Sequence, residues 1–191
     1  MWDPEAASGL GGYEHYYFFS SSQPSGETNF WGKNRVRNNV PTFKDTWIAC
    51  GQSVWFRCQS ACTITVAGQV VEVDTTVATL AGKYNLIANP FPTALRINDS
   101  TKIDWVGAGL VGTTSNTTAP EIQTWDPEAA AGLGGYTHYY FFSSSQPSGI
   151  TNFWGTNRVK NNYNADLALP VGAGFWLKYS GNTDLTFTFK K

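Results

Sequence analysis

The sequence predicts an all-β protein made of two tandem β-sandwich-like repeat units, of which the N-terminal one is incomplete. The main observation is an internal repeat, because residues 2–39 and residues 125–162 differ at only 5 of 38 positions. A fixed internal period indicates two copies of one structural unit. Aromatic and β-branched runs separated by turn clusters indicate strands. No segment keeps an apolar period of 3.6 residues for more than a turn or two, so little helix is expected.

The first copy is expected to begin with a short helical turn that leads into a strand. Residues 4–7 suit one helical turn, because Asp3 can cap it and a proline stands at the first helical position. The aromatic run at residues 13–19 predicts a strand, and the turn cluster at residues 20–24 ends it. The same features return 123 positions later, with Asp126 as the cap.

Four further strands are expected before the second copy. Residues 52–57 and 63–66 predict a hairpin. Residues 70–73 and 84–88 predict single strands, and the sequence Asn-Pro-Phe-Pro at residues 89–92 stops the second of these.

The chain ends with another predicted hairpin, formed by residues 174–179 and 185–189. Because residues 51–58 align with residues 172–179, the first copy is expected to contain the same hairpin. The tryptophans of the two copies are then expected in equivalent positions, Trp31 with Trp154 and Trp55 with Trp176.

The second copy has a lead-in, from about residue 70 to residue 124, that the first copy lacks. We therefore predict an incomplete N-terminal unit over residues 1–69 and a complete C-terminal unit over residues 70–191. A sandwich that is short of strands exposes unpaired backbone groups and an open core. Such an edge invites strand addition from another chain.

Three segments of the second unit resemble a known domain type. Residues 82–92 read Gly-Lys-Tyr-Asn-Leu-Ile-Ala-Asn-Pro-Phe-Pro, Ile-Asp-Trp follows at residues 103–105, and Gly-Ala-Gly-Phe-Trp-Leu-Lys follows at residues 172–178. This order resembles a repeat β-domain of large secreted bacterial surface proteins, often those exported through the type IX pathway. In that family a GWNLIGNPYP-like strand and a GQGFWVK-like strand bracket a variable middle.

The resemblance covers residues 76–191 and, from Trp2 to about residue 66, the back half of a second copy. The chain departs from the family pattern at Tyr84, where the family has Trp, and at Val54, where it has Phe. The resemblance implies a secreted β-domain and no shared catalytic residues.

The composition is that of an extracellular β-protein rather than a nucleic-acid or membrane protein. Charged residues make up 14 % of the chain and aromatic residues 15 %, and the net charge is −1. A chain this close to neutral has no electrostatic attraction for nucleic acid or an acidic membrane surface. No apolar run is long enough for membrane insertion. Met1 leads directly into Trp-Asp-Pro with no signal peptide, so we expect a mature or cloned form of an extracellular protein.

The chemically active residue types do not form a recognisable site. The two histidines, His15 and His138, are equivalent in the repeat, and metal ligation would need further ligands converging on each. Helix capping explains the repeated carboxylates more simply than a glycosidase pair or a calcium site does. These carboxylates are Asp3, Glu5, Asp126 and Glu128. We therefore predict no catalytic residue, no metal site and no cofactor.

The three cysteines favour an oxidising compartment. Cys58 and Cys62 flank the turn of the predicted hairpin, and a disulfide between them is geometrically plausible. Cys50 is then the odd cysteine, either free or bonded to another chain. The alternative pairings of Cys50 with Cys62 or with Cys58 remain open.

Paired aromatic residues are the interface or ligand candidates. Exposed tyrosine and tryptophan can stack on sugar rings, while the same residues also make a good core or protein interface. The candidates are Tyr13, Tyr16, Trp31, Tyr136, Tyr139 and Trp154. Ile150 joins them, because it puts an apolar group where the first copy has Glu27. We expect this exchange, and those of Glu14 with Thr137 and Lys33 with Thr156, to face solvent or a subunit contact.

Two functional classes remain, and neither is an enzyme. The favoured one is a non-catalytic extracellular structural protein that self-associates through its β-rich repeat units, such as a filament or surface-layer subunit. Its partners are copies of itself in head-to-tail association. The alternative is a carbohydrate- or ligand-binding module of a larger secreted protein, with glycans as partners.

Overall fold

The structure, a computed structural model, describes residues 2–3, 6–9, 11–20, 28–33, 48, 50–60, 63, 71–144, 149–156, 163–164 and 166–191. The chain divides into two compact units, unit 1 (Met1–Ala49) and unit 2 (Cys50–Lys191). The all-β class is confirmed, because among the described residues strands pair in several antiparallel sheets and the two helices are four residues long. Within this part of the chain no helix has the length and apolar character needed to cross a membrane.

Several predicted features lie outside the described residues. They are Pro4, Glu5, the turn at residues 21–24, Glu27, Cys62, the strand at residues 64–66, Val70 and the predicted unit boundary between residues 69 and 70.

The described residues of unit 1 form two antiparallel strand pairs. β1 (Trp2–Asp3) pairs with β2 (Gly12–Tyr13), and α1 (Ala6–Gly9) lies between them in the chain. β3 (Tyr16–Phe19) pairs with β4 (Phe30–Lys33). The predicted strand at residues 13–19 is therefore present as β2 and β3, with a break at residues 14 and 15.

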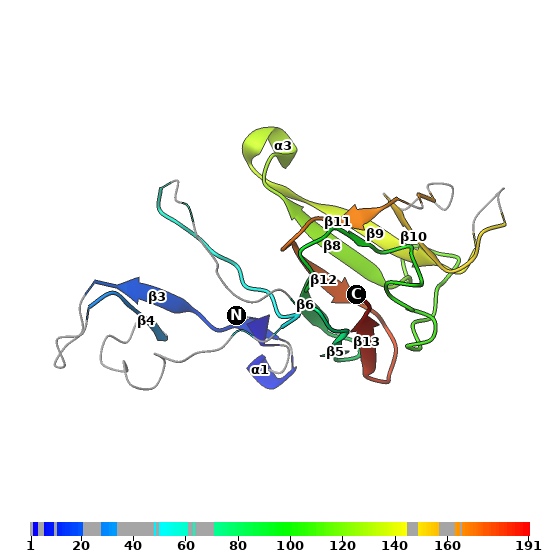
Figure 1. Cartoon of the computed structure of the whole chain (residues 1–191), viewed down its shortest axis with the longest axis horizontal. Helices are drawn as coiled ribbons and strands as arrows, with labels where there is room; N and C mark the ends of the chain where they lie inside the picture. The colour runs from blue at the N-terminus through cyan, green and yellow to red at the C-terminus, as the bar shows by residue number, and fades with distance from the viewer. Residues whose placement is uncertain are drawn as a thin grey trace. The chain divides into compact units, whose positions relative to one another are not determined.

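Unit 2 is organised around a five-stranded antiparallel sheet with the order β10-β9-β8-β12-β6 (Figure 1). Two smaller sheets accompany it, β11 with β7 and β13 with β5. The elements are β5 (Thr75–Thr79), β6 (Tyr84–Ala88), β7 (Leu95–Arg96), β8 (Glu121–Asp126), α3 (Ala129–Gly132), β9 (Gly135–Phe142), β10 (Phe153–Thr156), β11 (Ala168–Leu169), β12 (Gly174–Lys178) and β13 (Leu185–Phe189). In Figure 1, α3 caps the tip of the connection between β8 and β9.

The predicted strands at residues 84–88, 174–179 and 185–189 are confirmed as β6, β12 and β13, but the predicted C-terminal hairpin is wrong. β12 pairs with β6 along one edge and with β8 along the other, whereas β13 pairs with β5. Since both edges of β12 are filled, the chain has to leave this sheet at the end of β12.

Tyr179 fixes the point where the chain leaves. Its side chain is buried, and its hydroxyl donates to the carbonyl oxygen of Thr79 at 3.2 Å. The same hydroxyl accepts a hydrogen bond from the backbone N–H of Leu185 at 3.1 Å. The turn is thereby tied to β5, and β13 is directed alongside it.

The predicted strand at residues 52–57 is wrong. These residues form only an isolated bridge between Gln52 and Ile87, next to a hydrogen bond from the N–H of Ala88 to the carbonyl oxygen of Gly51 at 2.8 Å. The equivalent segment of the second copy, β12, has strand neighbours on both sides. In the first copy, only Gly51 and Gln52 pair with β6. The described part of the predicted strand at residues 70–73 also has no strand structure.

One face of the five-stranded sheet carries the main hydrophobic core. Successive side chains of a strand point to opposite faces, and the inward set is almost completely buried. β13 contributes two phenylalanines to the same cluster, and the loop that follows β7 contributes Ile97, Ile103 and Trp105. The inward set includes Ile87, Ile122, Phe141, Trp154, Phe175 and Leu177, and β13 adds Phe187 and Phe189.

The buried asparagine side chains at this core have hydrogen-bond partners. Asn85 in β6 accepts the N–H of Leu80 at 2.8 Å and donates to the carbonyl oxygens of Leu80 and Lys83, both at 3.1 Å. Asn89 donates to the carbonyl oxygen of Thr93 at 2.8 Å. A buried polar group is tolerated when it is hydrogen-bonded, so these asparagines fix the turns at both ends of β6.

Candidate functional site

The repeated segments fold into hairpins with the same strand register. Each pair of facing residues in unit 1 recurs 123 positions later in unit 2. The pairs in which both residues are aromatic are Trp2–Tyr13 and Trp125–Tyr136, Phe18–Trp31 and Phe141–Trp154, and Phe19–Phe30 and Phe142–Phe153. The repetition of the hairpin is thus visible in the structure, while the presence of two whole sandwich units stays a prediction.

A glycine is required at the start of each hairpin. A Cβ atom on Gly134 would lie 2.1 Å from Cζ2 of Trp125, and one on Gly11 would lie 2.3 Å from Cζ2 of Trp2. The indole ring therefore crosses the backbone where only hydrogen fits. The φ angles of +83° at Gly11 and +81° at Gly134 also favour glycine.

The β3–β4 hairpin of unit 1 and the β9–β10 hairpin of unit 2 differ in the burial of their aromatic faces. Phe18 is 56 % exposed, whereas its counterpart Phe141 is 1 % exposed. Trp31 is 41 % exposed, whereas Trp154 is fully buried. Trp31 and Trp154 were expected in equivalent positions. They have the same strand register, but the expectation is wrong for their surroundings, since one ring is exposed and the other is buried.

Core residues of unit 2 cover the aromatic face of the β9–β10 hairpin. The ring centroids of Trp154 and Trp105 are 5.3 Å apart, and those of Trp105 and Phe187 are 4.9 Å apart. All three rings belong to the main core. Asn98 holds the backbone of Trp154 in place, because its side chain accepts the N–H at 2.7 Å and donates to the carbonyl oxygen at 3.0 Å. The indole N–H of Trp154 itself has no hydrogen-bond partner in the described part of the chain.

The remaining aromatic candidates have mixed environments. Tyr13 and Tyr136 are both exposed, and each packs edge-to-face against the tryptophan opposite it. Tyr16 is half-buried and donates its hydroxyl to Glu14 at 3.0 Å. Tyr139 is half-buried against the main core. Their interface or ligand roles stay predictions.

Ile150 is half-buried and packs against a small cluster of Tyr140, Phe142 and Phe153 in its own unit. The cluster lies at the end of the sheet where β9 pairs with β10. The side chain therefore has an apolar neighbourhood within the chain, and its role at a subunit contact stays a prediction.

Two of the copy-to-copy differences form one ion pair. In unit 1 the ammonium group of Lys33 hydrogen-bonds the carboxylate of Glu14. In unit 2 both positions carry threonine, Thr137 and Thr156. The hydrogen bond from Lys33 holds the pKa of Glu14 below its ordinary value, and Glu14 raises the pKa of Lys33. The two exchanges are therefore one change, the replacement of a partly exposed ion pair by two small hydroxyls.

The histidines lie in aromatic rows along their strands. His15 stacks on Tyr17 with ring centroids 6.4 Å apart, and His138 stacks on Tyr140 at 6.3 Å. Nδ1 of His138 also lies 2.5 Å from a carboxylate oxygen of Glu121. Within the described residues, no group of three or more His, Cys, Asp or Glu side chains could hold a metal ion.

The predicted capped helical turns are not regular. Asp126 accepts the N–H of Glu128 at 3.0 Å, which is the hydrogen bond expected of a cap on the predicted turn at residues 127–130. α3 itself begins later, at Ala129, and has no side-chain cap of its own. Ala130 and Ala131 have φ angles of +51° and +56°, which belong to the left-handed region. The expected cap at Asp126 is therefore present, whereas the expectation of a regular helical turn after it is wrong.

The cysteines are only partly described. Cys50 is free and exposed, with its Sγ atom 3.8 Å from Oγ1 of Thr75. Cys58 is half-buried, and Cys62 lies outside the described residues. The predicted pairing of Cys58 with Cys62 stays a prediction.

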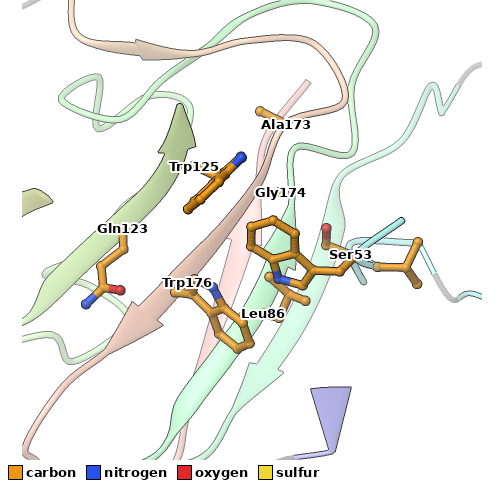
Figure 2. A pocket seen from close by; sticks show the side chains of 9 residues that line it. Ser53, Leu86, Gln123, Trp125, Ala173, Gly174 and Trp176 are labelled. Carbon is orange, nitrogen blue, oxygen red and sulfur yellow. The ribbon is translucent and has the colours of Figure 1, made fainter. Parts of the chain in front are cut away.

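The outer face of the five-stranded sheet holds a pocket that the sequence did not predict. Its volume is about 200 Å³. Figure 2 shows Gln123 and Trp125 of β8, Trp176 of β12 and Leu86 of β6 on adjacent strands, with Ser53 beside them. The full lining is Ser53, Val54, Trp55, Leu86, Gln123, Trp125, Ala173, Gly174 and Trp176. We call it the tryptophan pocket.

The three tryptophans of this pocket come from different parts of the chain. Trp176 is 6 % exposed, whereas Trp55 and Trp125 are 43 % and 42 % exposed. The rings of Trp55 and Trp125 meet edge-to-face with centroids 5.5 Å apart. The expectation that Trp55 and Trp176 occupy equivalent positions is wrong, because Trp176 lies in a central strand and Trp55 outside any strand. The two residues instead line the same pocket.

Comparison with protein-family models, with characterised proteins and with solved structures finds no match for this chain. The resemblance to a secreted bacterial surface domain therefore stays a prediction.

Proposed function

We propose that this protein is a non-catalytic extracellular structural protein that associates with copies of itself. The contact surface is the aromatic face of the unit 1 hairpin, with Phe18 and Trp31 at its centre. Filaments or surface layers are the assemblies that such a contact builds.

One observation carries the proposal. The same hairpin occurs twice with the same register, and its face is buried in unit 2 but exposed in unit 1. The sequence of this face is thus suited to burial. An exposed aromatic face whose counterpart in the same chain is buried is a candidate interaction surface, and tryptophan and other aromatic anchors dominate the binding energy of such surfaces.

The size of the face sets the expected strength of association. Covering two half-exposed aromatic rings removes about 200 Å² of surface, which is worth about 5 kcal/mol. This gain offsets only the lower end of the roughly 4–15 kcal/mol that association costs. We therefore expect neighbouring aromatic residues to contribute, and we expect weak, concentration-dependent association with a Kd of about 10–100 μM.

The association is proposed to be head-to-tail. The hairpin face of unit 2 is already covered by its own core, so the two units do not offer the same surface. A contact between unit 1 of one copy and a different surface of the next is heterologous, and it propagates as a filament unless its rotation closes a ring.

The extracellular location is supported by composition and by the cysteines. Few charges and many aromatic residues suit a secreted β-protein, and Cys58 and Cys62 are close enough in sequence to close a small loop. We propose that they form a disulfide and that Cys50 stays free.

The test is the mass of the intact chain in solution. Light scattering over a range of concentrations should give a mass above the 20.9 kDa of one chain, and electron microscopy should show open polymers. The double variant Phe18→Ser with Trp31→Ser should remain monomeric at every concentration.

A matched control changes exposed apolar residues elsewhere. Val111 is 75 % exposed and Leu133 is 86 % exposed, and both lie in unit 2. The double variant Val111→Ser with Leu133→Ser should associate as the wild type does. A wild-type chain that stays monomeric throughout, or a hairpin variant that still polymerises, would contradict the proposal.

A further inference from the structure

We propose that the tryptophan pocket binds one ring of a neutral carbohydrate. This inference does not depend on the proposed self-association, because the pocket belongs to unit 2 and the association surface to unit 1. It also differs from the aromatic candidates chosen from the sequence, since none of those residues lines the pocket.

The lining carries no charge. None of the nine lining residues is acidic, basic or a histidine. A charged ligand buried here would lose hydration without gaining a partner. The ligand class is therefore neutral.

Aromatic surface dominates the lining. Trp176 is nearly buried, while Trp55 and Trp125 keep about two-fifths of their surface exposed. Trp55 meets both Trp125 and Tyr136 edge-to-face, at 5.5 Å and 6.4 Å between ring centroids. The negative faces of such rings attract weakly positive C–H groups. One face of a pyranose ring presents a row of these groups.

Polar groups stand beside the aromatic surface. The side-chain amide of Gln123 and the hydroxyl of Ser53 make no hydrogen bond to any of the described residues. An amide and a hydroxyl can each donate and accept. A sugar hydroxyl does both as well, so the two sets of groups are complementary.

The same polar groups argue against an apolar peptide side chain as the ligand. Such a side chain would cover Gln123 and Ser53 and leave them unpaired, and an unpaired buried polar group reduces affinity. A carbohydrate ring covers the indoles with its C–H face and pairs the polar groups with its hydroxyls. The observations therefore favour a carbohydrate over a peptide.

The volume sets the size of the bound group. Pockets for drug-sized ligands measure roughly 300–1,000 Å³, whereas this pocket measures about 200 Å³. It therefore takes a single ring rather than a chain of rings. Because Trp55 and Trp125 are exposed, the rest of a glycan can continue into solvent.

The pocket wall formed by Ser53 is held in position by backbone contacts. The N–H of Ala88 donates to the carbonyl oxygen of Gly51 at 2.8 Å, and Gln52 bridges to Ile87 of β6. A Cβ atom on Gly174 would lie 2.1 Å from Oγ of Ser53, so the Ser53 side chain lies directly against the backbone of β12. A wall fixed before binding lowers the entropic cost of binding.

The experiment measures binding of defined neutral saccharides to the full chain. The probes are the methyl glycosides of glucose, galactose, mannose and N-acetylglucosamine, followed by trisaccharides that contain each of them. Saturation-transfer NMR and titration calorimetry should detect at least one of them, with a Kd of about 1 mM for a single ring. N-acetylproline amide and N-acetyltryptophan amide serve as peptide probes.

The repeat supplies a matched pair of variants. Trp125 packs on Tyr136 with centroids 5.1 Å apart, and Trp2 packs on Tyr13 at 5.0 Å, both at 71°. Trp125→Ala should weaken saccharide binding at least tenfold, while Trp2→Ala should leave it unchanged. Gln123→Leu, which removes the amide and keeps an apolar side chain, should weaken saccharide binding as well.

Each outcome decides the matter once folding of the variants has been checked by NMR. Loss of binding in Trp125→Ala and Gln123→Leu, with Trp2→Ala and the Phe18→Ser/Trp31→Ser variant unaffected, supports the site. The inference is overturned if no saccharide binds the intact chain, or if Gln123→Leu binds saccharide as the wild type does. It is also overturned if only the peptide probes bind, or if Trp2→Ala loses as much affinity as Trp125→Ala.

Discussion

Glu14 and Lys33 show how one hairpin sequence is adapted at two sites in the same chain. Their side chains are 30 % and 26 % exposed, and they hydrogen-bond each other in unit 1. In unit 2 threonine replaces both residues, so no charge is left without its partner. The sequence comparison had predicted surface or contact positions for these exchanges. The half-buried, paired arrangement agrees with a surface position and shows that the two exchanges depend on each other.

The first prediction concerns the pKa of Glu14, measured by NMR titration of its carboxyl carbon. The wild-type value should lie below the ordinary 4.5, because Lys33 donates a hydrogen bond to the carboxylate. Lys33→Thr should raise the pKa of Glu14. Tyr16→Phe should raise it less, since the hydrogen bond from Tyr16 is the smaller cause. An unchanged pKa in Lys33→Thr would contradict the pairing.

The pH dependence of stability follows from the two shifts. The lowered pKa of Glu14 contributes stability above its unfolded value, and this contribution is lost as pH falls through the folded pKa. The raised pKa of Lys33 contributes stability below 10.5, and this is lost as pH rises through its folded pKa. Between these limits a solvent-screened pair of this kind is worth about 0.2–1 kcal/mol.

At the scale of elements, some strands were predictable and their partners were not, and β4, β5, β8 and β10 were not predicted. The aromatic runs and turn clusters correctly predicted β3, β6, β9, β12 and β13. The hairpin expected between β12 and β13 failed because sequence neighbours pair only when an edge is free, and β6 and β8 fill both edges of β12. Edge occupancy depends on segments far apart in the chain, so local patterns do not report it.

The second prediction compares the same substitution in the two hairpins. Phe141→Ala should cost about 3–5 kcal/mol of unfolding free energy, because it opens a cavity in the core of unit 2. Phe18→Ala should cost less than about 1 kcal/mol, because the ring is largely exposed. Hydrogen exchange read separately for β9 and β3 measures both. Equal loss of protection in the two hairpins would show that Phe18 is covered in the dilute monomer.

At the scale of the whole molecule, the all-β class was predictable and the tryptophan pocket was not. Trp125 lies in the repeated segment, and Trp55 and Trp176 lie in aligned segments, so all three were visible as paired aromatics. Their meeting depends on the strand order β8-β12-β6 and on the departure of residues 51–55 from strand pairing. The alignment of residues 51–58 with residues 172–179 predicted a strand at that segment. A strand there would have given Trp55 a position equivalent to that of Trp176, so the pocket that the two residues line could not be predicted. No sequence pattern singled out Gln123, which lies outside the repeated segment.

The last prediction separates apolar from ionic association. The chain has 13 basic and 14 acidic residues, and the proposed contact surface centres on two uncharged rings. Raising NaCl from about 0.05 M to 0.5 M shortens the range of charge interactions several-fold. An ionic contact would dissociate under these conditions, whereas an aromatic contact should keep its strength. Ammonium sulfate should strengthen the aromatic contact further, because excluded salts favour burial of apolar surface. Light scattering at fixed protein concentration measures both effects. Dissociation by NaCl would mean that ion pairs hold the assembly together, and the role assigned to Phe18 and Trp31 would then be wrong.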